Sequence, residues 1–247
     1  MKGAILSINP QALIVDITHE IPPQDIEAAA FNLLATYKDF PAGTIHVAVV
    51  DPGVGSTRRP ILIEGGEQFF VGPDNGIFSW VCEREGSGRT IHLTNETFFR
   101  YSVSKTFHGR DVFAPVAAAL ASGTAVEKFG PEISDSVRLE PLLPAVTSDG
   151  SVAGRVIHID HFGNCITNLM PEHFSEQQAL SGAALYINGR EISSFRQSFS
   201  EGEIDGSDLF CLVGSAGFLE IAARNSSAAT ILNAERGNGV TLIPGRP

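Results

Sequence analysis

One segment sets the architecture of this chain: His46-Val-Ala-Val-Val-Asp51-Pro-Gly-Val-Gly55-Ser-Thr-Arg58-Arg59. Four apolar residues in a row end at a carboxylate, a pattern that predicts a buried strand followed by a loop. Because ligands of α/β proteins bind at the carboxyl ends of strands, Asp51 lies where a reactive side chain is useful. Asp is also a common cap of Pro-Gly turns, so this segment alone leaves the catalytic and capping interpretations equally open.

The composition describes a folded, acidic protein of 247 residues, of which 43% are hydrophobic and 18% charged. This is enough apolar sequence to bury a core, which argues against disorder. The formal net charge of −11, without any Lys/Arg run, argues against a nucleic-acid partner because the chain would repel a phosphate backbone. The three widely spaced cysteines fit reduced, buried thiols in a cytoplasmic protein better than disulfides or a zinc site. No apolar run reaches the length of a membrane span, so no membrane partner is expected.

The first half of the chain alternates predicted strands and helices. Apolar residues at helical spacing predict a helix that begins after Asp25 as its N-cap. This alternation predicts an α/β domain over residues 1–140 with a central, mostly parallel sheet. Strands are expected over 12–18, 44–50, 60–64, 68–72 and 90–93, and further helices over 77–84 and 112–122.

The second half differs from the first in its pattern of predicted elements. It follows a linker over residues 141–150, which contains Pro141 and Pro144. Short predicted strands separated by Gly and Asn turns dominate residues 151–247, which indicates a smaller all-β, barrel-like domain. The strands are expected over 152–159, 183–187, 209–213, 218–222 and 240–243.

Three loops of the first half carry side chains that can hold and activate a water: Asp51 with Arg58, the turn 73–76, and His108. A carboxylate can orient the water and accept a proton, a guanidinium can stabilise developing hydroxide, and an imidazole titrates near neutrality. Taken alone, His108 is better explained as a helix cap, and Arg58 or Arg59 as solvated surface residues.

Two other kinds of site find less support in the sequence. A metal site formed by Asp51, Asp74 and His108 is disfavoured because no HxH or HExxH spacing occurs. A Rossmann or P-loop nucleotide site is disfavoured because neither glycine-rich fingerprint is present.

Two polar stretches of the second half are candidate binding elements. In residues 159–168, Asp160 could pair with an ammonium group and Phe162 offers a face for stacking. On its own, this stretch is explained slightly better as a turn capped by Asp160. The stretch 213–226 combines a Gly-Ser turn with a polar loop whose backbone could read a base edge, although an ordinary hairpin explains it as well.

A set of motifs follows in order along the chain: Asp16-Ile-Thr-His19-Glu-Ile-Pro-Pro, Val50-Asp51-Pro-Gly-Val-Gly55-Ser, Phe70-Val-Gly-Pro73-Asp-Asn-Gly76, Thr106-Phe-His108-Gly-Arg-Asp-Val-Phe-Ala-Pro115, and Asp160-His-Phe162-Gly-Asn164 with Thr167-Asn168. As a set they resemble the S-adenosyl-L-methionine (SAM) hydroxide adenosyltransferase family, the adenosine-forming SAM hydrolases related to fluorinase and chlorinase. The resemblance extends over essentially the whole chain.

This resemblance implies a homotrimer in which SAM lies between the N-terminal domain of one subunit and the C-terminal domain of the next. It also implies a triad that positions water or hydroxide, which falls on Asp51, Arg58 and His108, with Arg59 as the rival of Arg58. The halogenating relatives depart from this set, so its presence implies hydrolysis rather than halide transfer.

The resemblance further implies binding roles in the second half. Asp160 would bind the methionine ammonium, Phe162 would stack on adenine, and Asn164 would contact a polar edge of the ligand. Ser215 would bind the methionine carboxylate, and the loop Arg224-Asn225-Ser226 would read the adenine edge through its backbone.

The implied reaction requires neither a cofactor nor a metal, because the sulfonium of SAM is already a good leaving group. Family members begin with a strand carrying a Thr-Asp-Phe-Gly-type motif whose Asp holds the ribose hydroxyls, whereas this sequence begins inside the following helix. We therefore expect the native start to lie upstream of Met1. The alternatives are a non-catalytic or weakened SAM- or adenosine-binding module and, with less support, a metal-dependent hydrolase.

Overall fold

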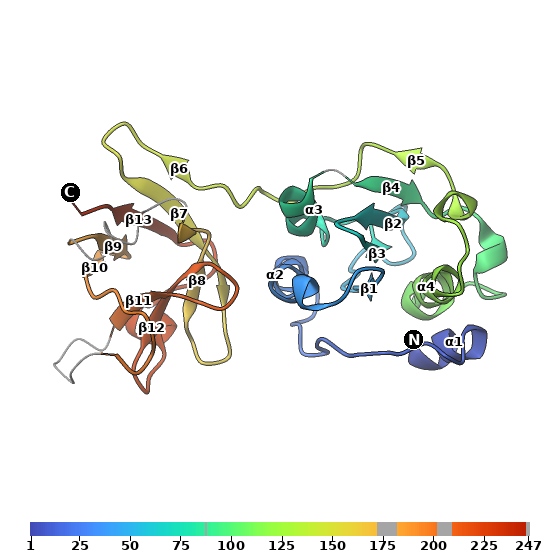
Figure 1. The fold of residues 1–247 in the computed structure, drawn as a ribbon, viewed down its shortest axis with the longest axis horizontal. Helices are drawn as coiled ribbons and strands as arrows, with labels where there is room; N and C mark the ends of the chain where they lie inside the picture. The colour runs from blue at the N-terminus through green and yellow to red at the C-terminus, as the bar shows by residue number, and fades with distance from the viewer. Residues whose placement is uncertain (87, 172–181, 202–208, 246–247) are drawn as a thin grey trace. The chain divides into compact units, whose positions relative to one another are not determined.

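The strand-forming sequence of the first half builds a five-stranded sheet with the order β1-β3-β2-β4-β5. The computed structural model describes residues 1–86, 88–171, 182–201 and 209–245. The chain divides into two units, Met1–Pro141 and Leu142–Pro247. In the first unit α2 and α3 lie on one side of the sheet, and α4 lies on the other side beside α1 (Figure 1). The elements of this unit are α1 (Lys2–Ile8), α2 (Ile26–Thr36), η1 (Tyr37–Asp39), β1 (Ile45–Val47), β2 (Pro60–Gly65), β3 (Gln68–Pro73), α3 (Ser79–Glu85), β4 (Arg89–His92), η2 (Glu96–Phe98), η3 (Gly109–Phe113), α4 (Ala114–Ala121), η4 (Val126–Phe129) and β5 (Glu132–Ile133).

The sheet of the first unit is mixed, so the expected mostly parallel arrangement is corrected. Only β1 runs parallel to its neighbour among the described pairs, with Ile45 opposite Phe69 of β3. The pairs β2–β3, β2–β4 and β4–β5 are antiparallel. The turn at Gly66-Glu67 explains part of this difference, because a two-residue connection can only return the chain antiparallel to itself.

Residues 12–18 form no strand, contrary to the sequence prediction. Their alternating apolar side chains remain outside, with Leu13 92% and Val15 59% exposed. Alternation favours an extended chain, but a strand also needs a hydrogen-bonded neighbour, and none pairs with this segment in the described part of the chain. The strand expected over 44–50 is also shorter, since β1 ends at Val47.

The helix predicted after Asp25 is confirmed. The Asp25 carboxylate accepts a hydrogen bond from the Ala28 backbone N–H at 3.0 Å, which satisfies one of the free donors of the first turn of α2. The apolar face of α2 buries Phe31 and Leu34. On the other side of the sheet, Phe113 and Val116 are fully buried in a cluster that includes sheet residues.

The second unit is a strongly curved antiparallel sheet with the order β10-β9-β13-β7-β8-β12-β11, and β6 also pairs with β7. The two ends of this order approach each other, because β10 contacts β11 and an isolated bridge joins Phe195 to Cys211. The sheet is therefore a nearly closed barrel, as the sequence predicts. Its elements are β6 (Ala145–Val146), β7 (Val152–Ile159), β8 (Cys165–Thr167), β9 (Ala184–Ile187), β10 (Arg190–Ile192), β11 (Leu209–Val213), β12 (Leu219–Ala223), α6 (Ala228–Leu232) and β13 (Gly239–Ile243).

The barrel encloses its own core, in which Val156, Leu185 and Ile221 are almost completely buried. Cys82, Cys165 and Cys211 are free and buried, as expected for reduced thiols.

None of the helices within the described ranges combines the length and the apolar character that crossing a membrane requires.

Candidate active site

The loop that follows β1 brings Asp51 and Arg58 into a buried ion pair. Arg58 Nε donates to Asp51 Oδ1 at 3.0 Å, and Nη2 donates to Oδ2 at 2.5 Å. The side chains are only 7% and 6% exposed. Two parallel N–H···O bonds fix the plane of the guanidinium against the carboxylate more firmly than a single contact would. Both oxygens of Asp51 are therefore committed to Arg58, instead of capping the Pro-Gly turn.

Gly55 allows this loop to pack closely on the segment that leads to His108. Its φ of +77° lies in the left-handed region, and a Cβ atom at this position would lie 2.3 Å from the Lys105 carbonyl oxygen. Any larger residue would push the two segments apart. The glycine in the Asp51-Pro-Gly-Val-Gly55 motif thus explains how Arg58 reaches a residue 50 positions along the chain.

His108 completes the cluster. Its Nδ1 lies 3.0 Å from Arg58 Nη2. Burial lowers the pKa of His108, and the positive charge of Arg58 lowers it further. The side chain makes no capping hydrogen bond, although the residue stands at the N-terminus of the π-helical turn η3. The structure therefore joins Asp51, Arg58 and His108 into one hydrogen-bonded cluster.

One donor of this cluster is unused. Nη1 of Arg58 is buried and has no hydrogen-bond partner among the residues that the structure describes. The ring of Phe113 lies beneath the same guanidinium, with Arg58 Cζ 5.4 Å from the ring centroid. A cation that bonds a carboxylate and lies over an aromatic ring, with one terminal NH2 group free, is suited to binding a water or hydroxide.

Sequence reasoning missed Asp111, which holds the loop before His108 in place. Asp111 is 1% exposed, and its carboxylate accepts hydrogen bonds from Arg110 Nε at 2.6 Å and from the Ser104 backbone N–H at 2.9 Å. The hydrogen bond from Arg110 lowers the pKa of Asp111 to about 2. The available signal was the Arg-Asp pair directly after His108-Gly, since a buried Asp needs such a partner.

Arg59 belongs to a different network. It bonds Asp74 Oδ2 through Nε at 2.8 Å and Asp135 Oδ1 through Nη1 at 2.8 Å. Asp74 is buried and accepts a further bond from the Val137 backbone N–H at 2.8 Å. Of the two neighbouring arginines, Arg58 is thus the one that contacts Asp51.

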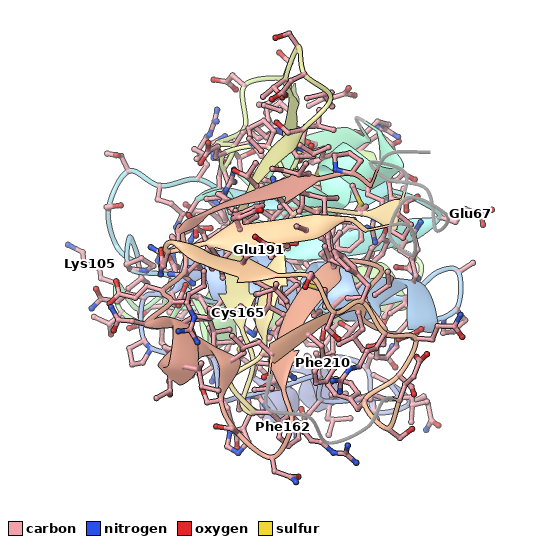
Figure 2. All side chains as sticks on the ribbon, turned by 90° about the vertical axis from the view of Figure 1, so that its left-hand side faces the viewer. Glu67, Lys105, Phe162, Cys165, Glu191 and Phe210 are labelled. Atoms are coloured by element: carbon pink, nitrogen blue, oxygen red, sulfur yellow. The ribbon has the colours of Figure 1, made fainter. Side chains whose placement is uncertain are left out.

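The second unit contains a cavity of about 520 Å³, within the range typical of small-molecule sites. Phe162 is 76% exposed and lies on the turn between β7 and β8, at the edge of the unit in Figure 2. Phe199, which sequence reasoning missed, is 51% exposed and adds a second ring. It stands in a polar segment without periodicity, where an isolated aromatic residue was the available signal. The lining residues are Phe162, Asn164, Phe199, Ala223, Asn225 and Ser226.

A glycine again explains how two parts of this cavity meet. Gly163 has a φ of +83°, and a Cβ atom there would lie 2.1 Å from Ser227 Oγ. Its carbonyl also accepts a hydrogen bond from the Ala229 N–H at 2.9 Å, which ties the turn to the start of α6. This contact places the turn that carries Phe162 beside the loop 224–226.

Asp160 caps its own turn, as one interpretation of the sequence anticipated. One carboxylate oxygen accepts hydrogen bonds from the N–H groups of Phe162 at 2.9 Å and Asn164 at 2.8 Å. The other accepts a bond from Asn164 Nδ2 at 2.8 Å. Asp160, Ser215 and Arg224 are not among the residues that line the cavity, and Ser215 and Arg224 are exposed.

Both halves of the chain match models of one protein family. The model of the SAM hydroxide adenosyltransferase N-terminal domain matches residues 1–130, and that of the C-terminal domain matches residues 154–241. The chain belongs to the SAM hydroxide adenosyltransferase family. The family models also confirm the two-domain architecture.

Relatives within and around the SAM hydroxide adenosyltransferase family match almost the whole chain. The chain is 37% identical to the (R)-S-adenosyl-L-methionine hydrolase of Methanocaldococcus jannaschii over 98% of its length and 89% of that protein. It is 26% identical to the fluorinase of Nocardia brasiliensis over 99% of its length and 91% of that protein. A crystal structure of an uncharacterized conserved protein from Thermotoga maritima aligns with a TM-score of 0.87 and 34% identity, covering 99% and 93% of the two chains.

Two acidic side chains of the first unit bond arginines, which bears on the metal site considered from the sequence. Within the described ranges, no group of three or more His, Cys, Asp or Glu side chains is arranged to hold a metal ion. The carboxylate of Asp51 faces Arg58, and that of Asp74 faces Arg59. Because each of these acids already bonds a guanidinium, the alternative site formed by Asp51, Asp74 and His108 is not assembled.

Proposed function

We propose that this protein hydrolyses SAM to adenosine and L-methionine by attack of water or hydroxide on the ribose C5′ carbon. The observation that carries the proposal is the buried cluster of Asp51, Arg58 and His108, with the unpartnered Nη1 group of Arg58, in a member of the SAM hydroxide adenosyltransferase family. Membership alone does not separate hydrolysis from halide transfer, since fluorinases are also relatives.

The chemistry explains why these side chains suffice. The water oxygen forms a bond to C5′ as the C5′–sulfur bond breaks, and the electron pair of that bond converts the sulfonium to the neutral thioether of methionine. No acid is needed at the leaving group, and one proton is released from the attacking water. The task of the protein is to position the nucleophile and to raise its hydroxide character.

Each member of the cluster has a role in this proposal. The free Nη1 of Arg58 binds the attacking oxygen, and its positive charge stabilises hydroxide relative to water, whose pKa in bulk is about 15.7. Asp51 holds the guanidinium through two hydrogen bonds. His108 accepts a hydrogen bond from Arg58 Nη2 and thereby holds the guanidinium from a second side without adding a charge. Asp51 is the acceptor of the proton that the attacking water loses, because Nδ1 of His108 already accepts from Arg58.

The cavity of the second unit is the proposed binding site for the nucleoside. Phe162 stacks on the adenine ring, Asn164 contacts its polar edge, and the loop Arg224-Asn225-Ser226 reads that edge through its backbone. Four of these residues line the cavity, namely Phe162, Asn164, Asn225 and Ser226. Asp160 binds the methionine ammonium and Ser215 binds its carboxylate, as the family resemblance implies.

We propose further that SAM binds between the first unit of one subunit and the second unit of a neighbour in a homotrimer. Coexpression of two impaired variants, assayed at a SAM concentration too low to saturate the weakened site, tests this arrangement directly. Asp51→Asn disables only the first unit and Phe162→Ala only the second, so mixed trimers should regain part of the wild-type activity. Coexpressed variants that form trimers by light scattering but show no more activity than the separate variants would rule out the shared site.

The experiment that tests the proposed activity is incubation of the protein with SAM and separation of the products by chromatography. Adenosine and methionine in equal amounts are expected, with a characterised SAM hydrolase as the positive control. EDTA should not change the rate, because no cofactor or metal is proposed. Tight binding of SAM by calorimetry without adenosine release would instead support the alternative of a non-catalytic binding module.

A further inference from the structure

The turn Pro73–Gly76 has no role in the chemistry proposed above, yet it contacts both ends of the loop that carries Asp51 and Arg58. Asn75 Nδ2 donates to the Val50 carbonyl oxygen at 2.8 Å, directly before Asp51. At the other end, Arg59 Nε donates to Asp74 Oδ2 at 2.8 Å, directly after Arg58. Two consecutive residues of one turn therefore hold the two flanks of the catalytic loop.

The turn itself is held firmly enough to act as a support. Asn75 Oδ1 accepts a hydrogen bond from the Ile77 backbone N–H at 3.2 Å, so both ends of its amide are engaged. Asp74 is 5% exposed and accepts bonds from Arg59 and from the Val137 N–H. Its own backbone N–H donates to the Arg59 carbonyl at 2.9 Å. The support thus belongs to the packed interior of the first unit rather than to a free loop.

We propose that Asp74 and Asn75 form a clamp that sets the position of Asp51 against Arg58, and that Asn75 is a positioning residue for the reaction. Two hydrogen bonds between a carboxylate and a guanidinium need both groups in one plane, so a shift of either end of the loop weakens both bonds together. Misplacement by about 1 Å at a reacting group costs up to about 100-fold in rate. The kinetic part of this inference rests on the proposed SAM hydrolysis.

The sequence offers a matched pair of variants to test the clamp. Asn75→Asp keeps the oxygen that accepts from Ile77 and removes the N–H that donates to Val50. Asn95 has the same pattern in the same unit, because its Nδ2 donates to the Lys128 carbonyl at 2.8 Å and its Oδ1 accepts from the Thr97 N–H at 3.2 Å. Both asparagines are half-buried. Asn95→Asp therefore removes an equivalent hydrogen bond outside the catalytic loop.

The two variants should lose similar thermal stability but differ in catalysis. For Asn75→Asp we expect kcat to fall about 10- to 100-fold while KM for SAM and the affinity for adenosine stay within about twofold. Asn95→Asp should keep wild-type kinetics. Equal kcat in the two variants, or a rise in KM that accounts for the loss, would overturn the clamp.

A second readout separates this inference from the proposed activity. If the wild-type protein releases no adenosine, the proposed function fails, and the clamp is then judged from the NMR signal of the Arg58 Nε–H, assigned by its loss in Arg58→Lys. Asn75→Asp should shift this signal and speed its exchange with solvent, whereas Asn95→Asp should leave it unchanged. An unaffected signal in Asn75→Asp would show that the loop does not depend on the turn.

Discussion

Arg58 Nη2 lies 3.0 Å from Nδ1 of His108. An arginine N–H can only donate, so Nδ1 must carry a lone pair, and the ring is neutral with its proton on Nε2. The pKa of His108 agrees with this assignment, because burial and then the charge of Arg58 lower it below the ordinary value of 6.5. The cluster therefore joins the Asp51–Arg58 ion pair to an uncharged imidazole.

This relationship fixes the direction of the pH dependence. Above pH 6.5, the titration of His108 should not change the rate of SAM hydrolysis. The rate should decline only as pH falls below 6.5, toward the lowered pKa of His108. The folded state also loses stability in that window, because the unfolded chain binds the proton more readily. Profiles of kcat and of unfolding free energy against pH measure both effects. An acid limb centred above pH 6.5, or one that persists in His108→Gln, would contradict the assignment.

Asp51→Asn should damage both catalysis and folding. The substitution leaves the charge of Arg58 buried without its counter-ion, which costs about 3–5 kcal/mol of unfolding free energy. Adenosine release should fall at least about 100-fold because the guanidinium is no longer held in place. Asp16→Asn is the control, since its partner Lys2 and Asp16 itself are 55% and 43% exposed, and exposed pairs contribute less than about 1 kcal/mol. Similar melting temperatures for the two variants would show that the buried pair is dispensable.

Local sequence patterns predicted most elements but not how they combine. The Asp25 cap and the strands expected over 60–64 and 68–72 depend on neighbours a few residues away, and they are confirmed. The direction of the sheet depends on which strands pair, and residues 12–18 show that alternation without a partner strand produces only an extended segment. Pairing is a long-range property that one sequence does not reveal.

In the candidate site, too, the sequence predicted the residues but not the long-range contacts between them. The sequence named Asp51, Arg58 and His108 but could not choose between adjacent arginines, because the choice depends on the contact of Gly55 with Lys105 and of Arg59 with Asp74. Phe199 was missed because no periodic pattern surrounds it. In both cases the deciding contact joins segments that lie far apart along the chain.

Phe162→Ala tests the nucleoside site of the second unit. Phe162 is 76% exposed, so its removal should leave the melting temperature unchanged. Stacking of a base on an aromatic ring contributes about 1–3 kcal/mol, so the affinity for adenosine should fall about 5- to 150-fold. Calorimetry with adenosine measures this change, and Phe162→Tyr should retain the affinity. Val146→Ala, at a site 69% exposed in the same unit, provides the control. Unchanged binding in Phe162→Ala would remove Phe162 from the site.

Glu220→Gln should stabilise the protein at alkaline pH. Burial, with a smaller contribution from the charge of Asp160, raises the pKa of Glu220 from the ordinary 4.5 to about 7. Between these values the unfolded chain has lost a proton that the folded chain retains, so wild-type stability declines as pH rises from 4.5 to about 7. Gln cannot ionise and avoids this loss. The variant's free energy of unfolding should therefore match that of the wild type near pH 4.5 and exceed it by on the order of 1–2 kcal/mol at pH 8, after allowance for solvent screening.

Glu191→Gln is the control, because Glu191 is exposed on β10 and accepts a hydrogen bond from Tyr186 Oη at 2.8 Å (Figure 2). A stability difference for Glu220→Gln that does not change between pH 4.5 and pH 8 would show that Glu220 has the same pKa in the folded and unfolded states.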